Sequence, residues 1–85
     1  MAKIEIYTAA MCPFCVRAVK LLQAKGQNFE QIDVTLNRTL RQHMMQRSGG
    51  SHTVPQIFIN DDHIGGCDDL YRLERAGHLD GLLAG

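Results

Sequence analysis

Hydrophobic and polar residues alternate near the start of the chain, over residues 3–8. Alternation with a period of two, rich in β-branched side chains, is typical of a strand. From Pro13 the spacing becomes helical, and a proline suits the first helical position because its missing N–H would have no partner there. We therefore predict a strand over residues 3–8 and a helix over residues 13–25, with an inward face that carries Val16, Val19 and Leu22.

The same patterns predict six further segments: strands over residues 29–34, 54–60 and 63–64, helices over residues 38–47 and about 68–77, and a last docking turn over residues 79–83. Asn37 is a candidate cap for the second helix. Acidic residues favour the start of a helix, and Asp68 and Asp69 stand where the third one begins. The expected inward residues of the second strand and second helix are Ile32, Val34, Leu40 and Met44.

This order of elements, β-α-β-α-β-β-α, restricts the fold. A β-α-β opening implies two parallel strands joined by a crossover helix, and the short turn at residues 60–62 implies an antiparallel hairpin. The expected fold is therefore of the α/β class, with a mixed four-stranded sheet flanked by helices. A chain of 85 residues fits one small domain, residues 1–85.

Composition and charge exclude several classes of protein. Nine basic side chains balance nine acidic ones, so the chain has neither the basic footprint of a nucleic-acid binder nor an acidic tail. No apolar run approaches the length of a membrane span. The first five residues include an acid and no long apolar stretch, so we expect no signal peptide.

Cysteine is the residue whose count and spacing change this picture. There are three cysteines, an odd number that does not suit a secreted domain held together by disulfides. Cys12 and Cys15 are three residues apart, and Cys67 lies 52 residues further on. This arrangement predicts a reducing compartment, the cytoplasm, and a working pair of thiols.

Cys12 and Cys15 are placed for thiol chemistry by the predicted helix. Cys12 would lie at its N-terminus, where unpaired N–H groups stabilise an anion and favour the reactive thiolate. Cys15 would come round to the same side of the first turn and, being more inward, would resolve a disulfide on Cys12. A structural zinc site is the alternative, but Cys67, His63 and His52 do not complete a common zinc signature, so we expect no metal.

Two later motifs each allow two interpretations from the residues alone. Pro55 is either an ordinary proline at the start of a strand or part of a cis Val54–Pro55 turn that offers the Val54 backbone to an extended thiol peptide. The run from Gly65 to Asp69 is either a turn with a helix cap, or a site where Asp69 pairs with an ammonium and the helix start holds a carboxylate. Alone, Cys67 is more often a small buried hydrophobe than a second nucleophile.

Three blocks of sequence together resemble the glutaredoxin family, dithiol class. They are Cys12-Pro13-Phe14-Cys15 preceded by Tyr7-Thr8, the run from Thr53 to Ile59, and the run from Gly65 to Leu70, and their order and spacing hold from about residue 4 to residue 83. The resemblance implies the thioredoxin fold, a cis Pro55, and a glutathione-dependent disulfide oxidoreductase. It implies glutathione as co-substrate, with no tightly bound cofactor.

The resemblance also implies roles for individual residues. Cys12 is similar to the family's nucleophile and Cys15 to its resolving thiol. The other matches concern glutathione: its cysteinyl backbone is held by Thr53 and Val54 before Pro55, its γ-glutamyl end by Cys67 and Asp68 with Asp69 as a neighbour, and its glycyl carboxylate by Arg41. The implied partners are disulfide-bearing or glutathionylated proteins, ribonucleotide reductase among the candidates, and a monomer is expected.

Three departures from the family pattern stand beside these matches. Phe14 occupies a position that is commonly Tyr, and Ala9 one that is often Lys. The segment from residue 49 to residue 52 looks slightly long. Two rival functions are a glutaredoxin-like electron donor that thioredoxin reductase serves, and an iron–sulfur carrier in which Cys12 and glutathione hold a cluster across a dimer.

Overall fold

The computed structural model describes residues 2–85 of the chain. Within them the elements follow the order β1 (Ile4–Thr8), α1 (Pro13–Ala24), β2 (Glu30–Asp33), α2 (Arg38–Arg47), β3 (Gln56–Ile59), β4 (Asp62–Gly65), α3 (Cys67–Arg75) and α4 (Leu79–Ala84). The predicted order is confirmed, and the expected last turn is the short helix α4. None of the helices described is long and apolar enough to cross a membrane.

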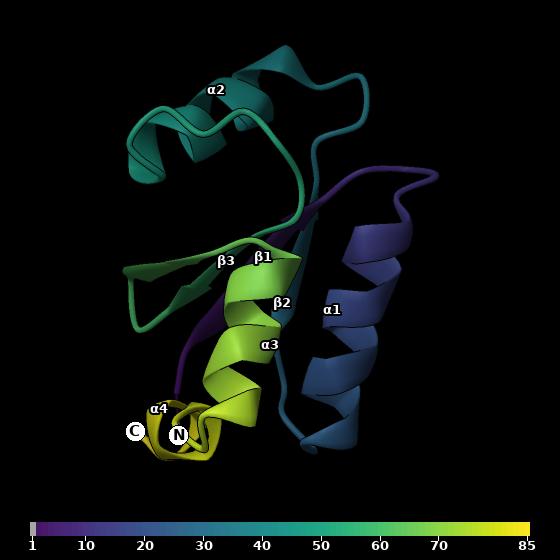
Figure 1. Ribbon diagram of the computed structural model, residues 1–85. Coiled ribbons are helices and arrows are strands. Elements are labelled where there is room, and N and C mark those ends of the chain that lie inside the picture. Colours follow the sequence, from purple (N-terminus) through teal and green to yellow (C-terminus); the bar gives the residue numbers. More distant parts are fainter. Residues whose placement is uncertain (1) are drawn as a thin grey trace.

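The four strands form one mixed sheet in the order β2-β1-β3-β4 (Figure 1). β1 pairs in parallel with β2, as the crossover through α1 predicts, and β3 pairs antiparallel with both β1 and β4. β1 is therefore an inner strand. Its antiparallel register with β3 ends on the pair Tyr7 and Gln56, which sets the end of β1 beside the start of β3.

Helices cover both faces of the sheet. Figure 1 shows α1 and α3 side by side on one face and α2 across the other. The core under α1 and α3 contains Ile4, Ile6, Ala18, Leu22, Ile57, Ile59, Cys67, Leu70, Leu79 and Leu83. The smaller core under α2 contains Tyr7, Val34, Met44 and Phe58. Alternate residues of β1 and β3 thus enter opposite cores, and the predicted inward positions Val34 and Met44 are confirmed.

Because helices cover both faces of the sheet, a charged residue of β1 is also buried. Glu5 in β1 is only 8% exposed, and its carboxylate accepts hydrogen bonds from Nη1 and Nη2 of Arg47 in α2, at 3.2 and 2.9 Å. Nη1 also donates to the Tyr7 hydroxyl at 3.0 Å, and the guanidinium lies 4.0 Å from the centre of the Phe58 ring. The bonds to Glu5 raise the pKa of Arg47. This ion pair attaches α2 to the sheet.

The predicted inward face of α1 is wrong in one respect. Val16 is 52% exposed, whereas Cys15, Ala18 and Leu22 are buried. The buried face combines the small side chains of Cys15 and Ala18 with Leu22, and a pattern that weights bulky apolar residues misses the two small ones. Leu22 and the partly buried Val19 face inward as predicted.

The third strand is shorter than predicted. It begins at Gln56 and not at Val54, because Val54 and Pro55 form a cis peptide turn and proline has no N–H to contribute to the sheet. The turn predicted at residues 60–62 is confirmed, with positive φ at Asn60 and Asp61. Two consecutive residues of that kind match the twist of an antiparallel hairpin.

Substitution Arg47→Met should destabilise the fold, because the nearly buried Glu5 carboxylate loses both hydrogen bonds from the guanidinium and keeps only Lys3, at 4.0 Å, as a neighbouring cation. We expect the free energy of unfolding in urea to fall by about 2–4 kcal/mol. Arg75→Met is the matched control, since Arg75 lies exposed at the end of α3 and forms no ion pair within residues 2–85; its effect should stay within about 0.5 kcal/mol. Equal effects of the two substitutions would contradict this role of Arg47.

Candidate functional site

Cys12 stands immediately before α1, as its N-terminal cap. Its backbone is extended, Pro13 occupies the first helical position, and the Cys12 sulfur accepts the N–H of Cys15 at 3.1 Å. No acidic residue lies in the first turn of α1 to oppose a negative charge there. The partial positive charge of the helix end and this N–H both favour a thiolate on Cys12 in the reduced protein.

Cys15 comes round to the same side of the helix and is joined to Cys12 by a disulfide. The two Cα atoms are 5.2 Å apart, within the range of ordinary disulfides. Cys15 is 4% exposed, and Cys12 is the more accessible of the two. An incoming sulfur therefore reaches Cys12 first, while Cys15 can react only with Cys12.

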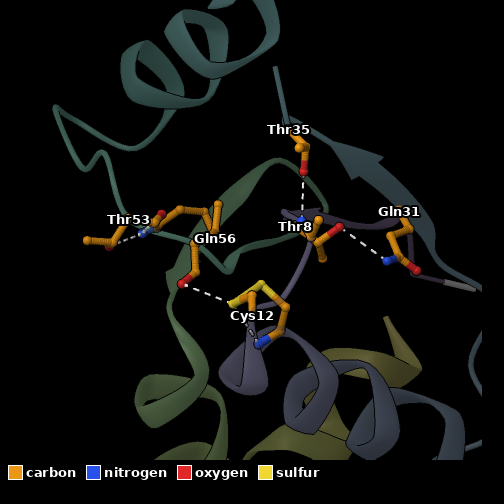
Figure 2. The surroundings of a disulfide bond; sticks show 9 residues. Thr8, Cys12, Gln31, Thr35, Thr53 and Gln56 are labelled. Carbon is orange, nitrogen blue, oxygen red and sulfur yellow. Dashed lines mark hydrogen bonds between the residues drawn. A yellow bond between two sulfur atoms is a disulfide. The ribbon is translucent and has the colours of Figure 1, made fainter. Parts of the chain in front are cut away.

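Hydrogen bonds to β2 and to the segment just after it hold the end of β1 and the loop before Cys12. Figure 2 shows two of them: the Ala10 N–H donates to the Thr35 hydroxyl at 2.7 Å, and the Gln31 side chain donates to the Thr8 hydroxyl at 3.1 Å. Thr8, Gln31 and Thr35 did not figure among the residues predicted for the site. Their hydroxyl and amide groups are common in any sequence, and only the pairing of β1 with β2 brings them together.

The cis Val54–Pro55 turn lies directly against the disulfide. The Val54 carbonyl oxygen is 3.8 Å from the Cys12 sulfur (Figure 2). Beside it, the buried side chain of Gln56 donates from Nε2 to the carbonyl and the hydroxyl of Thr53, at 3.0 and 3.2 Å. Of the two interpretations of Pro55, the cis turn is therefore the one that the structure has.

A groove of about 450 Å³ opens on this side of the disulfide. We call it the Pro55 groove; it is lined by Phe14, Ser51, Thr53, Val54, Pro55, Gln56, His63, Gly65, Gly66, Cys67, Asp68 and Asp69. Six of the predicted glutathione-site residues thus share one groove, although they come from the loop before β3 and the start of α3. The seventh, Arg41, is not among the lining residues.

The wall of the Pro55 groove on the α3 side is a helix start. Asp69 accepts the N–H of Gly66 at 3.0 Å and also pairs with Arg72, so its carboxylate caps the helix from within. Gly65 has φ +119°, and a side chain there would collide with the Asp69 carboxylate. The N–H groups of Cys67 and Asp68 belong to the first helical turn, where amides have no partner within the helix. This wall can bind a carboxylate.

Cys67 is buried in that wall and is not bonded to another cysteine. Burial raises the pKa of its thiol, and nearby Asp68 acts in the same direction, while Arg17 partly offsets them. The Cys67 thiol is therefore mostly protonated at neutral pH. It is buried as the small hydrophobe that the sequence predicted, in the wall of the Pro55 groove.

Arg41 occupies a separate place on α2. Its Nη1 donates to the carbonyl oxygen of His52 at 2.8 Å, and it lines a small hollow with Val34, Leu36, Asn37 and Arg38. Since His52 precedes Thr53 in the chain, Arg41 holds the segment that leads into the Pro55 groove. Its side chain remains partly exposed at the surface.

The two single-residue departures lie on either side of the disulfide. Phe14 is 53% exposed and lines the Pro55 groove. Ala9 packs on the core under α2 and lines a second groove, of about 630 Å³, together with Met11, Cys12, Cys15 and Val16. Cys12 thus lines the largely apolar second groove, and its contact with the Val54 carbonyl oxygen sets it beside the Pro55 groove, whose lining mixes polar and apolar groups. In residues 2–85, no three His, Cys, Asp or Glu side chains gather to hold a metal ion.

Comparison with known proteins gives one consistent family. The family model described as "Glutaredoxin" matches residues 4–64. Glutaredoxin 3 of Escherichia coli is 53% identical over 83 residues, which cover 98% of this chain and 99% of that protein. Among solved structures, glutaredoxin from Brucella melitensis has a TM-score of 0.85 at 52% identity, covering 98% of this chain and 89% of that one.

A more distant match is a buckwheat glutaredoxin–glutathione complex. It has a TM-score of 0.86 at 28% identity and covers 98% of this chain and 77% of that one.

The different burial of the three cysteines should appear in their reactivity. In the reduced, native protein at neutral pH, we expect iodoacetamide to modify Cys12 first and to leave Cys67 unmodified, because Cys67 is buried and its raised pKa keeps it protonated. Peptide mass spectrometry over a time course measures this order. The control is the same reaction in guanidinium chloride, where all three should react. Native labelling of Cys67 at the rate of Cys12 would contradict the prediction.

Proposed function

Since the chain belongs to the glutaredoxin family of glutathione-dependent disulfide oxidoreductases, we propose how its own residues carry out thiol–disulfide exchange. The observation that carries the proposal is the position of Cys12. It caps α1, where a thiolate is stabilised, and it lies against the cis Val54–Pro55 turn at the edge of the Pro55 groove. Cys12 thus places a reactive sulfur beside the Pro55 groove, which is of suitable size for a small thiol peptide.

With a glutathionylated protein, the Cys12 thiolate attacks the glutathione sulfur. A sulfur–sulfur bond forms between Cys12 and glutathione, and the protein thiolate leaves and takes up a proton. A second glutathione thiolate then attacks the glutathione sulfur on Cys12, which releases oxidised glutathione and restores the Cys12 thiolate. This route uses only one cysteine of the protein.

With a protein disulfide, the first product is a mixed disulfide between Cys12 and the substrate. The Cys15 thiolate then attacks the Cys12 sulfur, which releases the substrate as a dithiol and leaves the Cys12–Cys15 disulfide. Two glutathione molecules reduce that disulfide in turn. The short Cα–Cα distance and the burial of Cys15 support this role, because Cys15 has no other disulfide to attack.

We assign the Pro55 groove to glutathione. Thr53 and Val54, ahead of the cis Pro55, hold its cysteinyl backbone; the turn beside Cys12 supports this. Cys67 and Asp68 at the start of α3 hold the γ-glutamyl end, through helix N–H groups to its carboxylate and the Asp68 carboxylate to its amine. Asp69 contributes by capping that helix, since its carboxylate is engaged with Gly66 and Arg72.

Arg41 is the proposed partner of the glycyl carboxylate. Its attachment to His52 supports a place beside the loop that carries Thr53. It lies outside the groove walls, so we propose that it acts at long range or after a small movement of its side chain. Because Ala9 supplies no cation, Arg41 carries more of this charge recognition than in relatives with a lysine.

The apolar groove beside Cys12 and Cys15 is the proposed surface for the protein part of the substrate. Met11, Phe14 and Val16 are exposed around Cys12, and apolar contacts of that kind suit many protein surfaces. Ribonucleotide reductase is one proposed substrate. We further propose a monomer of one domain, residues 1–85, that acts in the cytoplasm with no tightly bound cofactor.

Substitution of each cysteine should distinguish the role of Cys12 from that of Cys15. Cys12→Ser should abolish glutathione-dependent reduction of every disulfide, because the nucleophile is lost. Cys15→Ser should retain reduction of a glutathionylated peptide, with rates that saturate in reduced glutathione, and should lose most activity on a protein disulfide. Coupled assays with glutathione reductase measure both. Full activity of Cys12→Ser would exclude the proposed mechanism, and equal loss of both activities in Cys15→Ser would exclude the one-cysteine route.

Charge at the rim of the glutathione site should set the affinity for glutathione. We expect Arg41→Met to raise the KM for a glutathionylated peptide about twofold to fivefold, the size of an exposed ion pair. Ala9→Lys should lower that KM by a similar factor, because it restores the cation that the family often has there. Arg75→Met is the control and should change nothing. An unchanged KM in both Arg41→Met and Ala9→Lys would remove the carboxylate assignment.

A further inference from the structure

Gln56 is a buried polar side chain whose three hydrogen bonds form a chain. Its Nε2 reaches back to Thr53, as described above, and its Oε1 lies 2.6 Å from Nε2 of His63 in β4. Gln56 is 4% exposed, so its amide has little access to water and depends on these partners. The three residues link β4, the start of β3 and the loop beside Cys12.

The Thr53 carbonyl fixes which way the Gln56 amide faces, and His63 binds its other end. An amide oxygen only accepts, so His63 must carry its proton on Nε2. A turned-over amide would set its oxygen against the Thr53 carbonyl oxygen, and both are acceptors, so Nε2 points to Thr53 and Oε1 to His63. The His63 ring is itself held, since it packs against the Phe58 ring with centroids 5.0 Å apart. His63 therefore anchors the Oε1 end of the amide whose Nε2 end donates to Thr53.

We propose that His63 is a positioning residue for glutathione, acting through Gln56 to hold Thr53 and Val54 in place beside Cys12. This inference rests on the proposed assignment of Thr53 and Val54 to the cysteinyl backbone of glutathione. Thr53 itself is exposed, so the bonds from Gln56 are what restrict its loop. The cis turn fixes Val54 from one side, and the His63–Gln56 chain fixes Thr53 from the other.

A direct role is the rival interpretation, because His63 also lines the Pro55 groove. A double-mutant cycle separates the two roles. His63→Phe keeps a ring against Phe58 but removes the donor, and Gln56→Met keeps the length of a buried side chain but removes its hydrogen bonds. His63→Gln retains an N–H at the same number of bonds from the backbone and serves as the rescue variant.

The measurement uses two substrates. The first is the mixed disulfide of cysteine and glutathione, for which kcat and KM are obtained. The second is 2-hydroxyethyl disulfide, reduced by the prereduced protein in a single turnover without glutathione. For His63→Phe we expect KM for the first substrate to rise about threefold to tenfold, the loss of one hydrogen bond, with the second rate unchanged. His63→Gln should restore most of the affinity, and the double variant should be no weaker than Gln56→Met alone.

Several results would overturn the inference. One is an unchanged KM in His63→Phe. A second is additive losses of affinity in the double variant, which would indicate that His63 contacts glutathione directly. A third is loss of activity on both substrates together, which would indicate damage to the fold. Long-range ¹H–¹⁵N spectra above neutral pH give an independent check, because they should show the His63 proton on Nε2 in the native protein. Failure of the proposed function itself is distinguishable, since the wild-type protein would then show no preference for the glutathione disulfide.

Discussion

The antiparallel pairing of β1 with β3 is the constraint on which the site depends. Its last pair, Tyr7 with Gln56, sets the residue five positions before Cys12 next to the residue two positions after Val54. From that pair, the segment after Tyr7 leads to the N-terminus of α1, and the segment before Gln56 contains the cis turn. As a result, the Cys12 sulfur and the Val54 carbonyl oxygen lie 3.8 Å apart. A shift in this register would leave Cys12 reactive but without the wall of its groove.

Polar side chains complete what the backbone pairing begins. Thr35 and Gln31 hold the loop on the β2 side of Cys12, and Gln56 holds the loop on the β3 side. Each bond is worth little alone, about 1 kcal/mol, but together they restrict two loops that carry no secondary structure of their own. On the far face of the sheet, the Glu5–Arg47 pair fixes α2 and with it Arg41.

The features that the sequence could predict are those decided by neighbours along the chain. Cys12, Pro13 and Cys15 form one helical start, and their geometry follows from three residues of local sequence. The order of strands and helices follows from periodicity in the same way. The cis state of Pro55 needed the resemblance to a family, since the residues alone allowed both isomers.

The features that the sequence could not predict depend on contacts across the fold. Glu5 is a polar position in the alternating pattern of the first strand, and that pattern gives no sign that α2 covers this face or that Arg47 supplies a partner. The sequence predicted that Val16 faces inward because it is bulky and apolar. In the structure Val16 is exposed and Ala18 is buried. His63 is exposed, but its hydrogen bond to the buried Gln56 depends on the pairing of β3 with β4 and could not be predicted from the sequence.

The burial of Cys67 has a consequence for how the chain oxidises. Three cysteines could form three different single disulfides. Since Cys67 is buried between α3 and the sheet and its raised pKa keeps its thiol protonated, it reacts more slowly than Cys12, and the two pairings that involve it are disfavoured while the fold is intact. The favoured oxidised form is therefore the Cys12–Cys15 disulfide, through which the two-cysteine route passes. An enzyme that exchanges disulfides in other proteins is in this way protected from scrambling its own.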